Sequence, residues 1–197
     1  MYHEPMRSSH ASRPPASRDV GTAVARAQDG DVQAFEELLD MYEAPLLRLA
    51  VRMLRDRSEA EDIVQDTFLT VWRRLHTLED VEKFKTWIYR LTSNACIDVI
   101  RRRERQRTTA TDPSDLVTVV SSESSLEDAT ERGEALRHLE SVLVTLPAEQ
   151  RLAWLLFEIE GQSYAEIAAV MDSTEGSVRG RIHRARAAIV RGMEGWA

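Results

Sequence analysis

The densest run of hydrogen-bond donors lies near the C-terminal end, where residues 176–191 contain five arginines and no acidic residue. On a helix, the apolar side chains of this segment fall on one side, and small residues alternate with donors on the other. The outward side carries Gly176, Ser177, Gly180, His183, Arg184 and Ala187, flanked by Arg179, Arg181 and Arg186. Small residues let a helix enter a DNA major groove, while Arg and Ser reach base edges or phosphates. A solvated arginine-rich face is the alternative, but the outward glycines favour DNA reading.

A second basic segment covers residues 83–105, with seven basic and two acidic residues. Trp87 and Tyr89 stand beside Lys85 and Arg90, and the segment closes on Arg101, Arg102, Arg103 and Arg105. Aromatic rings beside cations can stack on unpaired bases and hold a nucleic-acid backbone. Two other interpretations stay open, because Trp87 could be a core residue and the terminal arginines could complement the helix dipole.

The helix predicted before this basic segment has an acidic and polar face. Its members are Glu59, Asp62, Gln65 and Asp66. Such a face could bind another protein, or it could be a solvated surface whose acids are stabilised by the helix N-terminus. The residues alone do not separate these two interpretations.

The remaining composition excludes several classes of protein. A single cysteine, Cys96, excludes an internal disulfide or a multi-cysteine zinc site and favours a reducing, cytoplasmic compartment. The five histidines are scattered and no carboxylates cluster with a basic pocket, so we expect no enzyme, no metal and no cofactor. No stretch approaches the ~20 apolar residues of a membrane span, and the N-terminus lacks the apolar core of a secretory signal. We therefore expect no direct membrane insertion.

Helical periodicity runs through most of the chain, and no segment alternates as a strand does. The sequence therefore predicts an all-α protein with helices over about 19–28, 32–54, 58–76, 84–105, 134–145, 148–160, 164–171 and 175–192. Asp31, Ser58 and Ser163 are the expected N-caps, the last two within capping boxes, and Pro45 should kink its helix. Apolar positions expected to be buried include Trp72, Leu91, Ala95 and Leu136.

The helices form two groups on either side of a segment rich in Ser, Thr and Asp. Residues 106–133 contain six acids and two bases. We expect a disordered tail over 1–18, a helical bundle over 19–107, a flexible acidic linker over 108–133 and a helix-turn-helix domain over 134–197. The short turn between the last two helices and the arginines of the second helix are typical of helix-turn-helix domains.

The motifs as a set resemble the extracytoplasmic-function group of bacterial sigma factors, within the sigma-70 family. AFEELLDMYEAPLLRLA, SEAEDIVQDTFLTVWRRL and FKTWIYRLTSNACIDVIRRR resemble region 2 of that family. LPAEQRLAWLLFEIEGQSYAEIAAVMDSTEGSVRGRIHRARAAI resembles region 4. The resemblance covers about residues 34–105 and 134–190, in the order found in the family. Many relatives carry other residues in place of Gly180 and His183, which bears on which bases are read.

The resemblance implies a function in transcription initiation and a role for each group of candidate residues. Region 2 would dock on the clamp of the RNA polymerase β′ subunit through Glu59, Asp62, Gln65 and Asp66. It would bind the −10 promoter element, capturing a flipped base at the loop 77–81, with Trp87, Asn94, Asp98, Arg101, Arg102 and Arg103. Region 4 would sit on the β flap and read the −35 element with Ser177, Arg179, Gly180, His183 and Arg184.

Further expectations follow from the same resemblance. The protein would be a non-catalytic subunit that directs core polymerase to promoter DNA and helps melt it. An anti-sigma factor is an expected partner, and the linker would extend toward the RNA exit channel. The alternative is a stand-alone helix-turn-helix regulator that never contacts polymerase.

Overall fold

The computed structural model describes residues 17–109 and 131–194, and every regular element within these two ranges is a helix. The predicted all-α class is confirmed. The predicted tail (1–18) and linker (108–133) fall almost entirely outside the described residues and stay predictions. The helix before the linker continues to Thr109, and the helix after it begins at Glu131. No helix in the described part is long and apolar enough to span a membrane.

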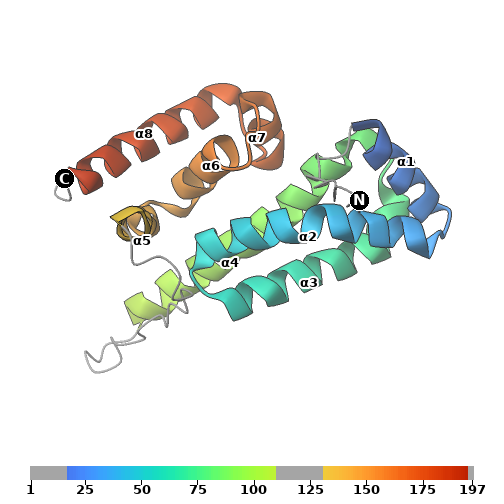
Figure 1. Cartoon of the computed structure of the whole chain (residues 1–197), viewed down its shortest axis with the longest axis horizontal. Helices are drawn as coiled ribbons and strands as arrows, with labels where there is room; N and C mark the ends of the chain where they lie inside the picture. The colour runs from blue at the N-terminus through green and yellow to red at the C-terminus, as the bar shows by residue number, and fades with distance from the viewer. Residues whose placement is uncertain (1–16, 110–130, 195–197) are drawn as a thin grey trace, which may run out of the picture.

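An N-terminal unit is formed by four helices, with two short 3₁₀ turns before the fourth (Figure 1). Its elements are α1 (Ser17–Gln28), α2 (Val32–Leu54), α3 (Arg57–Arg74), η1 (Leu75–Thr77), η2 (Val81–Lys83) and α4 (Phe84–Thr109). Helices α2, α3 and α4 pack against one another. The largest fully buried side chains between them are Leu38, Leu46, Leu49, Met53, Phe84 and Ile88. Their spacing of three, four and seven residues gives α2 and α4 the apolar stripes that this packing needs.

The helix starts follow the capping chemistry of the sequence, with one correction. The Asp31 side chain accepts a hydrogen bond from the Ala34 N–H at 3.1 Å, as expected. The predicted Ser58 cap is wrong, because Asp56 caps α3 by accepting from the Glu59 N–H at 3.0 Å. Arg55 adopts a left-handed conformation (φ 54°) that ends α2 and brings Asp56 into place. The turn between α2 and α3 is therefore two residues long, shorter than the sequence indicated.

Some apolar side chains lie elsewhere than predicted. The prediction that Trp72 is buried is wrong, since it is 48% exposed and packs against Phe35 in an edge-to-face arrangement. Leu136 is also exposed, and Leu91 and Ala95 of α4 are half-buried. Helix α4 instead buries Tyr89, Cys96, Ile97 and Ile100 in addition to the predicted Phe84, Ile88 and Val99. It buries more than one stripe because it is packed on two sides, by α2 and α3 and by helices that follow the linker.

The C-terminal unit contains α5 (Glu131–Thr145), α6 (Ala148–Glu158), α7 (Tyr164–Val170) and α8 (Glu175–Met193). Gly161 takes a left-handed φ of 64° just after α6, and the predicted Ser163–Glu166 capping box starts α7. Thr174 caps α8. Helix α8 packs against the three other helices through Val178, Ile182 and Ala185, all buried. Helices α7 and α8 thus form the predicted helix-turn-helix.

The two units are in contact, with α6 and α7 packed on α4 and α6 also against α2. Arg151 of α6 lies inside this contact and is only 4% exposed. Its guanidinium group donates to the carbonyl oxygen of Met53 (2.5 Å) at the end of α2 and to that of Val144 (2.6 Å) near the end of α5. Arg103 of α4 donates to the adjacent Leu54 carbonyl at 2.9 Å. The last carbonyls of a helix lack partners within the helix, so these arginines supply the missing donors.

The position of the α3 cap gives a stability prediction. Asp56→Ala removes the oxygen that accepts from the Glu59 N–H and should lower the free energy of unfolding by about 1 kcal/mol. Ser58→Ala alters an exposed side chain two residues away and should change it by less than about 0.5 kcal/mol. Urea denaturation followed by circular dichroism measures both. Equal losses for the two variants would contradict the assignment of Asp56 as the cap.

Candidate functional site

Helix α8 brings the five predicted DNA-reading residues together on its outward side. Arg179, His183 and Arg184 are exposed, and Ser177 and Gly180 are half-buried. The Thr174 hydroxyl accepts from the Ser177 N–H at 3.2 Å, which fixes the start of the helix. Figure 1 shows α8 on the side of the C-terminal unit away from α4, with α6 and α7 in between. The contact between the two units therefore leaves this face uncovered.

The arginines of α8 differ in how they are held. Arg179 pairs with Glu175 at 3.2 Å and lies over the Tyr164 ring, while Arg186 pairs with Glu158 at 2.7 Å and lies over Phe157. Arg184 forms no ion pair with any described residue. Its guanidinium group folds back over Gly180, where a Cβ atom would approach the Arg184 nitrogen to 3.3 Å. Gly180 therefore leaves room for Arg184, whose exposed charge is available to a ligand.

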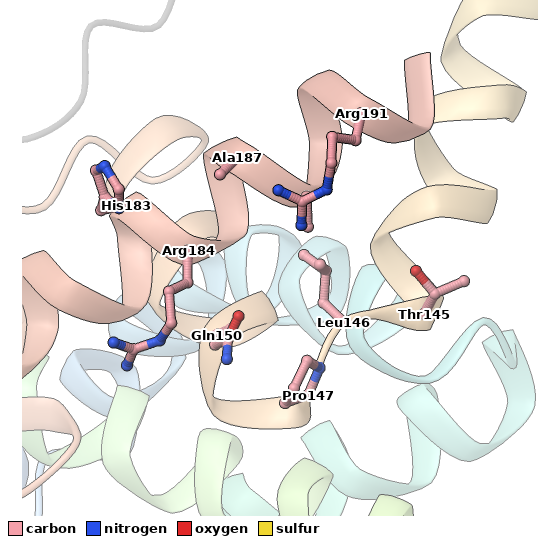
Figure 2. A pocket seen from close by; sticks show the side chains of 9 residues that line it. Thr145, Leu146, Pro147, Gln150, His183, Arg184, Ala187 and Arg191 are labelled. Carbon is pink, nitrogen blue, oxygen red and sulfur yellow. The ribbon is translucent and has the colours of Figure 1, made fainter. Parts of the chain in front are cut away.

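A hollow of about 380 Å³ adjoins this face (Figure 2). Figure 2 shows Arg184 and Arg191 on α8, opposite Leu146 and Pro147 of the turn between α5 and α6 and Gln150 of α6. Both arginines are exposed. They extend the positive charge of α8 along about two helical turns.

The predicted acidic face of α3 is present, and it is larger than the sequence suggested. Asp62, Gln65 and Asp66 are exposed, and so are Leu69 (51%) and Trp72 (48%) on the same side of the helix. These two apolar residues are functional candidates that the sequence analysis missed. The seven-residue spacing of Leu69 from Asp62 was the available signal. Glu59 is half-buried and pairs with Arg103 of α4, so it is engaged inside the N-terminal unit.

The residues predicted to bind the −10 element fall on two sides of α4. Helical spacing places Trp87, Asn94, Asp98 and Arg101 on one side, with Arg102 at its edge, and Arg103 on the opposite side. Trp87 is half-buried and packs edge-on against Phe84, with ring centroids 6.2 Å apart. Asn94, Asp98 and Arg101 line a second hollow of about 380 Å³ between α4 and the helices α6 to α8. Arg103 instead caps α2 and pairs with Glu59 and Asp56.

The C-terminal unit covers part of the α4 face. Lys85 pairs with Glu166 and Arg101 with Glu149, at 2.9 and 2.8 Å. Two opposing effects act on the pKa values of Glu149 and Glu166. Burial acts to raise them, whereas hydrogen bonds from backbone N–H groups and from the paired cations act to lower them. The lowering effects are larger together, so both pKa values lie below the usual value. The two carboxylates are therefore charged at neutral pH.

Two further side chains of α4 are removed from acid–base chemistry by burial. Burial raises the pKa of the Tyr89 hydroxyl, which stays protonated and donates to Glu160 at 2.8 Å. Burial likewise raises the pKa of the Cys96 thiol to about 12, so this cysteine is an unreactive core side chain. In the described ranges, no three His, Cys, Asp or Glu side chains group as metal ligands.

The loop that precedes α4 is held by a residue that the sequence analysis did not single out. The side-chain amide of Gln28, at the end of α1, donates to the carbonyl oxygens of Leu75 (2.9 Å) and Leu78 (2.7 Å). Helix α1 also packs against η1 and η2. The conformation of residues 75–83, which include the predicted base-capture loop 77–81, therefore depends on α1.

Two family models match the chain, one for each unit. Sigma-70 region 2 matches residues 38–106, and Sigma-70 region 4 matches residues 136–189. The ECF RNA polymerase sigma factor SigE of Mycolicibacterium smegmatis is 34% identical over 174 residues, which cover 87% of this chain and 67% of the relative. The chain therefore belongs to the sigma-70 family, in its extracytoplasmic-function group, and it directs promoter-specific transcription initiation through RNA polymerase.

Two solved structures support the same fold. CnrH in complex with the cytosolic domain of CnrY superimposes with a TM-score of 0.70 at 25% identity, covering 91% of this chain and 99% of that one. The sigma factor RpoE from Bartonella quintana, solved in complex with the anti-sigma factor NepR, gives a TM-score of 0.66 at 25% identity. The superposition covers 81% of this chain and 96% of the RpoE chain.

The role of Gln28 gives a second prediction. Gln28→Leu removes both hydrogen bonds and leaves the Leu75 and Leu78 carbonyls without these donors, so residues 75–83 should open more easily, by about 2 kcal/mol. Hydrogen–deuterium exchange with mass spectrometry measures this locally. Gln33→Leu, at an exposed position of α2, is the control and should leave the loop unchanged. Unchanged exchange at 75–83 in Gln28→Leu would show that α1 does not hold the loop.

Proposed function

We propose that the protein is a non-catalytic specificity subunit in which α8 reads the −35 element, α4 and the loop before it bind the −10 element, and α3 docks on the β′ clamp. The C-terminal unit would sit on the β flap, and the site of action would be the cytoplasm. The observation that carries the proposal is the uncovered outward face of α8, with Arg184 unpaired over Gly180. Because both sigma regions are present in one chain, a stand-alone helix-turn-helix regulator is disfavoured.

The composition of the α3 face supports docking on a protein. An exposed apolar strip beside fixed acidic charge is typical of a protein–protein surface, in which apolar residues supply affinity and charges supply orientation. Leu69 and Trp72 provide the apolar part, and Asp62 and Asp66 provide the charge. Figure 1 shows α3 on the opposite side of the molecule from α8, so polymerase and the −35 element need not compete for one surface.

We also propose an anti-sigma factor as a partner. The support is the likeness to RpoE, which was solved with such a factor. A partner that covered α3 or α8 would block a surface on which the proposed function depends.

Docking on polymerase is tested by changing the apolar part of the α3 face. Leu69→Glu should weaken binding to core polymerase at least about tenfold. It places a charge in the apolar part of the α3 face, which the proposed docking on polymerase would bury. Glu43→Arg changes an exposed position on α2 and should leave binding unchanged. A titration of labelled core polymerase measures both affinities, and circular dichroism checks folding. Equal affinity for wild type and Leu69→Glu would show that α3 does not form this interface.

Reading of the −35 element is tested with Arg184→Ala and Arg186→Ala in reconstituted holoenzyme. Arg184→Ala should cost about 1–3 kcal/mol on the cognate element and relax its sequence preference, because the unpaired guanidinium group is placed to reach a guanine. Arg186 is tied to Glu158, so its removal should weaken binding to all sequences similarly. Promoter binding to cognate and scrambled −35 duplexes at several salt concentrations measures the difference. Equal losses on both duplexes for Arg184→Ala would make Arg184 a phosphate contact only.

A further inference from the structure

Two arginines of α8 and two aromatic rings form a continuous stack along one flank of the helix-turn-helix. The Arg179 guanidinium carbon lies 5.0 Å from the ring centroid of Tyr164 of α7. Tyr164 stacks on Phe157 of α6, with ring centroids 4.9 Å apart and planes 17° from parallel. The Arg186 guanidinium carbon lies 5.2 Å from the Phe157 centroid. These four side chains, the arginine–aromatic stack, therefore join three helices.

The two arginines of the stack lie at the edge of the outward face of α8. They are seven residues apart, so they share one side of the helix and are separated by two turns, or about 10 Å. Phosphates of one DNA strand follow one another at about 3.4 Å along the duplex axis, so this separation corresponds to about three phosphate steps. Contacts to phosphates fix the register and orientation of a protein on the duplex.

Both guanidinium groups keep N–H donors for a phosphate. Glu158 accepts from Nε and Nη2 of Arg186 at 2.9 and 2.7 Å, and Glu175 accepts from Nη2 of Arg179 at 3.2 Å. Nη1 of each arginine has no hydrogen-bond partner within residues 17–109 and 131–194. The two ion pairs are about half exposed and therefore weak, so a phosphate can replace either carboxylate. The rings stay beneath the arginines whichever anion is bound.

We propose that the two rings of the arginine–aromatic stack are positioning residues for recognition of the −35 element, a proposal that rests on the proposed function of α8. Phe157 holds Arg186 in place. Tyr164 holds Arg179 in the same way, so the two guanidinium groups meet the DNA backbone as a pre-formed pair. Arg179 is then a backbone contact of the −35 site, and base reading is left to outward residues such as Arg184.

The physical reason is pre-organisation. An arginine side chain has many rotamers, and binding costs less when the side chain is restricted to the bound geometry beforehand. A ring beneath the guanidinium group restricts it through the ring face and uses none of its N–H donors. Phe157 has no polar group with which to bind a phosphate, so any effect of its ring on DNA binding must pass through its neighbours.

A double-mutant cycle between Phe157 and Arg186 tests the proposal in reconstituted holoenzyme. Phe157→Leu removes the ring and keeps an apolar side chain, and Arg186→Ala removes the cation. Phe157→Tyr is the matched control, because it changes the same position and keeps the ring. Affinity for a promoter with the cognate −35 element and for one with a scrambled element is measured at several salt concentrations, and circular dichroism of the free proteins checks folding.

Phe157→Leu should weaken promoter binding about threefold, the effect of losing one exposed cation–π contact, and Phe157→Tyr should bind as wild type does. The loss should be similar on cognate and scrambled −35 elements, because phosphates carry no sequence information. In the Arg186→Ala background, Phe157→Leu should cause at most about a 1.5-fold further loss, since the side chain that the ring positions is gone. Wild-type affinity of Phe157→Leu would overturn the proposal.

The other end of the stack gives an independent cycle between Tyr164 and Arg179. Tyr164→Leu should weaken promoter binding about threefold in the wild-type background and have little effect once Arg179→Ala is present. Equal losses from Tyr164→Leu in both backgrounds would show that this ring supports the fold of α7 and does not position Arg179.

Arg186→Ala alone separates failure of this proposal from failure of the proposed function. It should weaken promoter binding and reduce the salt slope of binding by about 1. If both quantities match wild type, this flank of α8 does not meet the DNA backbone, and the positioning role is overturned with that assignment. If Arg186→Ala behaves as expected and Phe157→Leu lowers affinity by the same factor with and without Arg186, only the positioning role is wrong.

Discussion

The arrangement of the helices depends on how the end of α2 is satisfied. Its last carbonyl oxygens have no partners within the helix, and they lie where water is largely excluded. Arg103 of α4 supplies a donor for Leu54, and Arg151 of α6 supplies one for Met53. Because these two arginines come from segments 48 residues apart, one helix end fixes both the packing of α4 in the N-terminal unit and the place where the C-terminal unit docks.

The arginines divide into structural and ligand-directed groups, and the division follows from their surroundings. The guanidinium groups of Arg103 and Arg151 donate to backbone carbonyls, and Arg103 also pairs with a carboxylate, so both are occupied by partners within the fold. Arg184 is exposed, folds back over Gly180 and forms no ion pair with any described residue, so its charge is available to a ligand. Three consecutive arginines at 101–103 show the principle most directly, because the 100° step of the helix sends Arg103 inward and leaves Arg101 and Arg102 exposed.

The fold could be predicted largely from local sequence signals. The apolar periodicity identifies each helix, and the ends of helices are marked by nearby residues: the N-caps Asp31 and Ser163, and Gly161 after α6. The Asp56 cap was missed because Asp56 and Ser58 are both residue types that commonly cap helices. The left-handed conformation of Arg55 brings Asp56 into the capping position, and the sequence does not reveal that conformation. The α8 face was predictable because one helix carries all of it. The pairing of α4 with Glu149 and Glu166, and the support of the loop by Gln28, join residues 47 to 81 positions apart, and periodicity holds no information about such pairs.

The uncovered position of α8 and the covered position of α4 affect which kinds of nucleic acid can reach the protein inside the cell. An aromatic and basic surface, as proposed for α4, can bind any single strand, because every base has a face on which a ring can stack. A bare surface of this kind would therefore not distinguish RNA single strands from a melted promoter strand by their sequence. The C-terminal unit lies across part of α4, whereas the outward face of α8 is left uncovered. If α4 binds unpaired bases as proposed, the packing of α6 and α7 on it leaves transcripts less of this surface than α8 offers to duplex DNA.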